Sequence, residues 1–215
     1  MVASDPGMNA LYTIGHSSHS WLEFAELLTQ HAIEVVCDVR SNPTSRRFPQ
    51  YDRRSLQANL EAIGIKYLWL GEELGGRGSA PGDYRGGTVS YQRLATKPGF
   101  VAGLERVRAG VVQCRIALMC AEKDPASCHR AILICRNLRD DPFEIKHILS
   151  DGALESHCDL DRRLLRINKL PEVDMFEPTE SLIGRAYAKQ EARIAHSRRS
   201  FGDGEDTDTL REEPG

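Results

Sequence analysis

The most informative segment of the sequence reads Ile116-Ala117-Leu118-Met119-Cys120-Ala121-Glu122-Lys123-Asp124-Pro125-Ala126-Ser127-Cys128-His129-Arg130. Its apolar beginning predicts a short buried strand. Asp124 and Pro125 then predict the start of a helix over residues 128–138, because an aspartate caps free backbone N–H groups and a proline needs none. Two thiols, an imidazole, a carboxylate and a guanidinium therefore lie at one strand-to-helix crossing, a natural place for a site in an α/β protein.

Strands and helices alternate along the chain around this segment. Apolar runs predict strands at residues 11–14, 33–39, 65–68, 115–119 and 144–149, and helical spacing predicts helices around 21–28, 53–63 and 91–107, the last interrupted near Pro98. This alternation predicts an α/β fold, a three-layer α/β/α domain with a mainly parallel sheet of about five strands. The glycine-rich segment 71–87 predicts an ordered functional loop or a mobile lid.

The predicted domain organisation has three parts. We expect the α/β domain over residues 8–170, a C-terminal helical extension over 171–200 and a disordered acidic tail over 201–215. An amphipathic helix is expected at 179–196, to pack either on the domain or on a partner. An oligomer formed through this helix is therefore one of the predictions.

The composition limits the class of protein. The 215 residues include 40% hydrophobic residues, enough for a core, and the formal net charge of −3 argues against a general polyanion binder. The chain contains no apolar run of about 18 residues, so we expect no membrane partner. Its beginning lacks a secretory pattern, and the six cysteines lack the spacing of a disulfide framework. A cytoplasmic protein with reduced thiols is expected.

Polar residues follow the predicted strands at one edge of the sheet. In an open parallel sheet, functional groups gather beyond the carboxyl ends of the strands. The candidates at this edge are His16, Ser17, Asp38, Arg40, Ser41, Gly75, Gly76, Arg77, Cys120 and Glu122.

Arginines around the second strand end indicate an anionic ligand. Residues 38–54 hold five arginines, Arg47 among them, against two aspartates, and guanidinium groups bind phosphate or carboxylate through paired N–H donors. An internal ion pair is the alternative for Asp38 and Arg40, and a solvated basic face is the alternative for the arginines as a group. Backbone N–H groups at Gly75 and Gly76 can also approach a phosphate, although the segment lacks the lysine of a P-loop.

Cys120, Glu122 and His16 are the candidate catalytic residues. A thiol at a strand end that faces a helix start ionises more easily and can act as a nucleophile. Glu122 can act as a general base or as a nucleophile at a sugar carbon, and His16 can transfer a proton. The alternatives are a structural cysteine, a glutamate paired with Lys123 or Arg130, and a histidine that fixes its turn.

The helix after Cys120 offers further ligands. Helical spacing places Cys128 toward the core or below Cys120, and it leaves His129 and Arg130 free to contact a ligand. A metal site made of Cys120, Cys128 and His129, with His16 as a further ligand, is an alternative. Because structural zinc sites favour close pairs such as Cys-x-x-Cys, which the segment lacks, we assign no metal ligand and identify no cofactor.

Taken together, these motifs resemble the domain-of-unknown-function 488 family of bacteria and archaea. The resemblance rests on Tyr12-Thr13-Ile14-Gly15-His16-Ser17, Asp38-Val39-Arg40-Ser41-Asn42-Pro43-Thr44-Ser45-Arg46-Arg47, Leu74-Gly75-Gly76-Arg77, Met119-Cys120-Ala121-Glu122-Lys123-Asp124-Pro125, Cys128-His129-Arg130, and His147-Ile148-Leu149 before Asp151-Gly152. It implies a compact α/β domain. The family brings no settled activity.

The sequence favours an enzyme that acts on a phosphorylated or nucleotide-like ligand. Arginines would hold the anion, and Cys120 or Glu122 would supply the nucleophile or base. A non-catalytic nucleotide or nucleic-acid binding module is the second hypothesis. A metal-dependent hydrolase or redox protein is the third.

Overall fold

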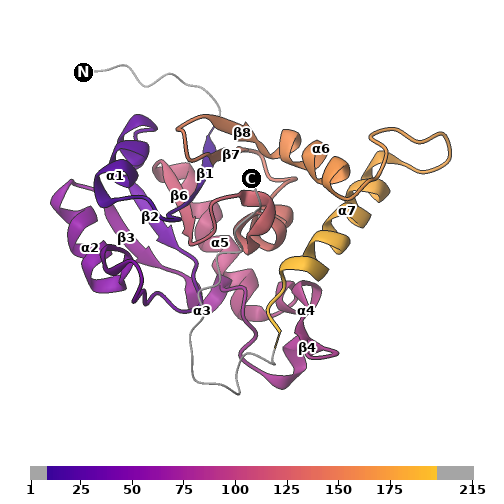
Figure 1. Cartoon of the computed structure of the whole chain (residues 1–215), viewed down its shortest axis with the longest axis horizontal. Helices are drawn as coiled ribbons and strands as arrows, with labels where there is room; N and C mark the ends of the chain where they lie inside the picture. The colour runs from indigo at the N-terminus through magenta and orange to yellow at the C-terminus, as the bar shows by residue number, and fades with distance from the viewer. Residues whose placement is uncertain (1–8, 198–215) are drawn as a thin grey trace.

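One six-stranded sheet with helices on both faces forms the centre of the computed structural model, which describes residues 9–197 (Figure 1). Its strands lie in the order β3-β2-β6-β1-β7-β8. Their bounds are β1 Ala10–Gly15, β2 Val35–Asp38, β3 Lys66–Trp69, β6 Ile116–Cys120, β7 Glu144–Ile148 and β8 Leu154–Ser156. All neighbours pair in parallel except β8, which is antiparallel to β7. The predicted α/β fold with a mainly parallel sheet is confirmed.

Two hydrophobic cores cover the two faces of the sheet. Helices α1 (Trp21–Gln30) and α2 (Arg53–Ala62) pack on one face, against Ala117 and Met119 of β6. Ile116 and Leu118 point to the other face, because successive side chains of a strand alternate. That face is covered by α3 (Gly71–Leu74), α4 (Tyr91–Ala95), α5 (Pro98–Gln113), α6 (His157–Ile167) and α7 (Thr179–Ile194).

Short-range signals explain several helix boundaries. The Ser20 hydroxyl accepts from the Glu23 N–H while the Glu23 carboxylate accepts from the Ser20 N–H, so α1 begins with a capping box. Asp52 caps α2 through the Arg54 N–H. Pro98 opens α5 and accounts for the expected interruption after α4.

The segment after β6 differs from the single helix expected at 128–138. A 3₁₀ turn at Pro125–Ser127 is followed by a π-helix at Arg130–Ile134 and a second 3₁₀ turn at Cys135–Asn137. A π-helix has i→i+5 hydrogen bonds and so fits more residues into each turn than an α-helix. Side-chain directions after residue 129 therefore differ from those of an α-helix.

The glycine-rich segment 71–87 contains regular structure. It includes α3, a 3₁₀ turn at Pro81–Asp83 and a hairpin of β4 (Tyr84–Arg85) and β5 (Thr88–Val89). Lys97 donates to the Asp83 carboxylate at 2.9 Å and ties the turn to the start of α5. This segment is an ordered connection that leads from β3 to α4.

The C-terminal part of the described chain packs on the domain. The inner face of α7 buries Leu182, Ile183, Ala186 and Tyr187. Beyond α7, the chain returns to the hairpin, where the Val89 N–H donates to the His196 carbonyl at 3.0 Å. The acidic tail expected at 201–215 lies outside the described residues. Between residues 9 and 197, none of the helices has the length and apolar character needed to cross a bilayer.

Candidate functional site

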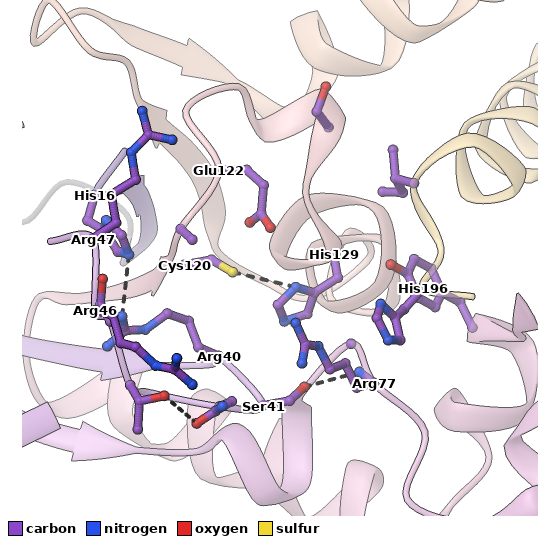
Figure 2. A pocket seen from close by; sticks show the side chains of 18 residues that line it. His16, Arg40, Ser41, Arg46, Arg47, Arg77, Cys120, Glu122, His129 and His196 are labelled. Carbon is purple, nitrogen blue, oxygen red and sulfur yellow. Dashed lines mark hydrogen bonds between the residues drawn. The ribbon is translucent and has the colours of Figure 1, made fainter. Parts of the chain in front are cut away.

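The carboxyl ends of three neighbouring strands, β2, β6 and β1, meet in the middle of the sheet. Gly15 pairs with Cys120, and Asp38 pairs with Met119, so the three strands end at the same level. A cavity of about 530 Å³ opens beyond these ends (Figure 2). This position is where open parallel sheets bind ligands.

Most of the residues expected at the site line this cavity. They are His16, Arg40, Ser41, Arg47, Gly76, Arg77, Cys120, Glu122 and His129. The remaining candidates are buried and do not line it: Ser17, Asp38, Gly75 and Arg130.

Arg40 forms an ion pair with Asp38 next to the cavity. Its Nε donates to Oδ1 at 2.9 Å and its Nη2 to Oδ2 at 2.7 Å, and both side chains are buried. The Tyr67 hydroxyl donates to the same carboxylate at 2.8 Å, and the Tyr51 carbonyl accepts from Arg40 Nη2 at 2.9 Å. The internal ion pair foreseen as an alternative is therefore present. It offsets most of the charge that Arg40 could offer to an anion.

His16 joins this ion pair to the cavity. Its ring stacks on Tyr51 with 4.1 Å between the centroids. Nδ1 donates to the Ser17 carbonyl at 2.9 Å, so Nε2 accepts from Nη1 of Arg40 at 3.3 Å. Burial, followed by the positive charge of Arg40, lowers the pKa of His16 to about 4. The imidazole is therefore neutral near pH 7.

Exposed arginines surround the opening of the cavity. Arg46 and Arg47 come from the loop after β2, and Arg77 comes from the segment after α3. Figure 2 shows Arg46 and Arg47 on one side and Arg77 on the other. The Arg77 N–H donates to the Ser41 hydroxyl at 3.1 Å and so joins the two segments. The cavity thus presents positive charge from two sides.

Cys120, Glu122, Cys128 and His129 form a cluster, here called the thiol–histidine cluster. The Cys128 thiol contacts Oε2 of Glu122 at 2.8 Å, and Nδ1 of His129 lies 3.6 Å from the sulfur of Cys120 and 3.9 Å from that of Cys128. Cys120, Glu122 and His129 line the cavity, whereas Cys128 is buried behind them. Its burial agrees with the core position expected for Cys128, but its sulfur faces the cluster.

The two thiols of the cluster differ in their readiness to ionise. Burial and the neighbouring Cys128 raise the pKa of the Cys120 thiol well above its ordinary value. Burial also raises the pKa of the Glu122 carboxyl to about 7. Although burial opposes ionisation of Cys128 too, its hydrogen bond with Cys120 and the charge of Arg130 hold the pKa of its thiol well below the usual range. The surroundings of Cys128 therefore favour a thiolate more than those of Cys120 do.

Two contacts hold the His129 ring in place. Nε2 donates to the Val39 carbonyl at 3.0 Å, and this bond turns Nδ1 toward the thiols. Gly76 packs against the ring, since a Cβ atom at this glycine would lie 2.7 Å from Cγ of His129. Gly76 therefore permits a close approach to His129, and it also lines the cavity in which a phosphate contact was expected for it.

Arg130 is completely buried and does not reach the cavity. Its guanidinium donates to the carbonyls of Glu122 at 2.7 Å and Lys123 at 3.1 Å, and to the Thr13 hydroxyl at 3.4 Å. The turn at the start of the π-helix directs this side chain inward. Arg130 thus holds the loop after β6, in place of the ligand contact expected from helical spacing.

Sequence reasoning missed residues that complete the cavity wall. Tyr91, Ser127, Ile194 and His196 also line it. Ile194 and His196 arrive from the end of α7, because the backbone near His196 binds the β4–β5 hairpin. Ser127 lies within the segment after β6 and was not selected as a candidate, whereas no local pattern marks Tyr91, Ile194 and His196, which long-range folding brings to the cavity.

A comparison with protein families identifies the chain's relatives. A family model described as "Domain of unknown function DUF488" matches residues 20–136, more than half of the chain. The chain belongs to this family. The matched part of the DUF488 domain includes Arg40 and the thiol–histidine cluster, and it begins after His16. No curated protein and no solved structure matches the chain.

Proposed function

We propose that the protein is an enzyme that binds a phosphorylated or nucleotide-like small molecule in this cavity. The proposal is carried by one observation: Arg46, Arg47 and Arg77 surround the cavity that Glu122 and Cys120 also line. Guanidinium groups bind phosphate through paired N–H donors. The volume of about 530 Å³ suits a small ligand.

The basic residues have different roles in this proposal. Arg46, Arg47 and Arg77 hold the anionic group, since they are exposed at the opening. Arg40 is engaged by Asp38 and His16, so it shapes the inner wall and adds little net charge.

Glu122 is the proposed reactive group. Its half-buried carboxylate faces the cavity, where it can accept a proton from a ligand hydroxyl or a water, or attack a sugar carbon. Cys120 is a weaker candidate for the nucleophile, because a raised pKa leaves its thiol protonated near pH 7.

We also propose that the protein works in the cytoplasm. All six cysteines, each within the described part of the chain, are unpaired. Unpaired thiols are typical of a reducing compartment.

The test is turnover of phosphorylated compounds by the full-length chain. Nucleoside monophosphates, nucleoside diphosphate sugars and ribose 5-phosphate are incubated with the protein, and consumption is followed by phosphorus NMR and chromatography. Glu122→Gln is expected to slow turnover by about 100-fold or more, whereas Glu61→Gln, an exposed change on α2, leaves the rate unchanged. Turnover that survives both Glu122→Gln and Cys120→Ser rejects the mechanism. Binding without turnover indicates the non-catalytic module.

A further inference from the structure

We infer that Cys120, Glu122, Cys128 and His129 bind a single transition-metal ion of the zinc class. One donor atom from each residue is available, and these atoms all lie within 4.8 Å of one another. Two thiolates, an imidazole and a carboxylate are donors that zinc accepts in tetrahedral sites. The inference adds a metal to the proposed site and does not require the proposed phosphorylated ligand; with the metal bound, Glu122 is a ligand of the ion rather than a free base.

The sulfur–nitrogen separations fit one central ion. Zinc–sulfur bonds of about 2.3 Å and zinc–nitrogen bonds of about 2.1 Å place tetrahedral S and N donors about 3.6 Å apart. The Cys120 and Cys128 sulfurs lie 3.6 and 3.9 Å from Nδ1 of His129. Both sulfur–nitrogen separations are therefore already close to the edge length of a tetrahedral site.

Hydrogen bonds around the cluster orient the donors toward its centre. The bond from His129 Nε2 to the Val39 carbonyl leaves the Nδ1 lone pair of a neutral ring facing the two sulfurs. Ligating histidines commonly have such a partner on the other ring nitrogen. The backbone N–H of Arg130 donates to the Cys128 sulfur at 3.4 Å and stabilises a thiolate there.

The buried charges are consistent with a divalent ion. Two thiolates and one carboxylate carry −3, and a divalent cation brings this sum to −1. Arg130 contributes the opposite charge: it is completely buried, its guanidinium donates to the Thr13 hydroxyl and to the backbone carbonyls of Glu122 and Lys123, and it lies close to the thiol of Cys128. A buried cation requires a nearby anion. The metal-bound cluster would provide it.

Glu122 is the ligand on the cavity side. Its Oε2 lies 2.8 Å from the Cys128 sulfur, closer than the roughly 3.5 Å between O and S donors on one zinc ion, so the carboxylate must turn when metal enters. Its half-buried side chain faces open space in the cavity. Catalytic zinc sites keep three protein ligands and one exchangeable position. The Glu122 position is therefore the one that a water or ligand oxygen can take.

Metal content and cobalt spectra test the inference without an activity assay. Full-length protein purified without chelators is expected to hold about one zinc ion per chain. Metal-free, reduced protein titrated with Co²⁺ is expected to develop thiolate-to-cobalt absorption that saturates at one equivalent. Cys128→Ala should abolish this absorption, and Cys135→Ala, which removes another buried thiol, should leave it intact.

A second variant keeps the test decisive if Cys128→Ala does not fold. Glu122→Gln changes a half-buried side chain and is expected to weaken Co²⁺ binding about tenfold or more. Equal Co²⁺ binding by the wild type, Cys128→Ala and Glu122→Gln would overturn the inference, as would absence of the thiolate absorption from the wild type. Binding of a phosphorylated ligand is measured separately with Arg47→Ala. A protein that does not bind such a ligand therefore still gives a clear result for metal binding.

Discussion

Gly76 lies directly against the ring of His129. A Cβ atom at Gly76 would lie 2.7 Å from Cγ and 2.8 Å from Cβ of His129. The ring cannot simply move away, because its Nε2 donates to the Val39 carbonyl at 3.0 Å. The close packing of the glycine-rich segment and the position of the His129 ring in the thiol–histidine cluster therefore both depend on this contact.

This contact predicts the effect of Gly76→Ala. The added methyl group should lower the free energy of unfolding by about 1–3 kcal/mol, as overpacking does. Gly82→Ala is the matched control, since a Cβ atom there meets no atom within 4 Å. Urea unfolding of both variants checks the prediction. Equal stabilities would show that the contact with His129 is not tight.

The ion pair between Asp38 and Arg40 predicts a large effect of Asp38→Asn. The change leaves the buried Arg40 guanidinium without its counter-ion, which typically costs about 3–5 kcal/mol of unfolding free energy. Glu73→Gln disrupts a more exposed pair with Arg106 and should cost about 1 kcal/mol or less. Urea unfolding compares the two. A loss for Asp38→Asn no larger than that for Glu73→Gln contradicts the account.

A buried chain of hydrogen bonds predicts the pH dependence of His157→Gln. The Thr13 hydroxyl contacts His147 at 2.8 Å, His147 contacts His157 at 3.0 Å, and His157 contacts the Tyr187 hydroxyl at 3.0 Å. Burial, followed by the positive charge of Arg139, lowers the pKa of His157 to about 4. Between about pH 6.5 and 4, His157 is therefore protonated in the unfolded chain and neutral in the folded chain. The free energy of unfolding of the wild type consequently decreases as pH falls through this range.

His157→Gln removes that titrating group. The destabilisation that it causes should therefore be smaller at pH 5 than at pH 7.5, by about 2 kcal/mol. Leu164→Ala removes packing from the same helix without a titratable group, and its cost should be similar at both pH values. Urea unfolding at the two pH values measures the difference. A cost of His157→Gln that does not change with pH would be inconsistent with a neutral buried imidazole.

Much of the fold was predictable because its signals are local. Apolar runs mark the central strands, and Asp52 and Pro98 mark the starts of α2 and α5. Helix α6 was missed although Ser156 caps it and Leu160, Leu164 and Leu165 are buried on one face. The insertion of β6 between β1 and β2 is a long-range pairing that no local pattern contains.

The site was predictable only where it follows from strand ends. His16, Arg40 and Cys120 meet because the ends of parallel strands share one edge. The placement of Arg130 was not predictable, since helical spacing assumes 3.6 residues per turn and the chain forms a π-helix there. The sulfur of Cys128 faces Glu122 in the same irregular region.

The role of the exposed arginines predicts how single substitutions change ligand affinity. Arg46→Ala, Arg47→Ala and Arg77→Ala should each weaken binding of a phosphorylated ligand about tenfold or more, because a charged hydrogen bond contributes about 1.5–3 kcal/mol. Arg54→Ala removes an equal charge from an exposed position on α2 that does not line the cavity, and it should have little effect. Higher salt should weaken binding to the wild type more than to Arg47→Ala.

Calorimetric titration of the full-length chain with adenosine 5′-monophosphate, ribose 5-phosphate and inorganic phosphate tests the central claim most directly. The account predicts that at least one of these ligands binds the wild type and Arg54→Ala with equal affinity and binds Arg47→Ala about tenfold or more weakly. Adenosine and ribose, which lack the phosphate, should bind the wild type more weakly than their phosphorylated forms. If none of the three binds the wild type more tightly than Arg47→Ala, the cavity is not a phosphate site and the proposed function is contradicted.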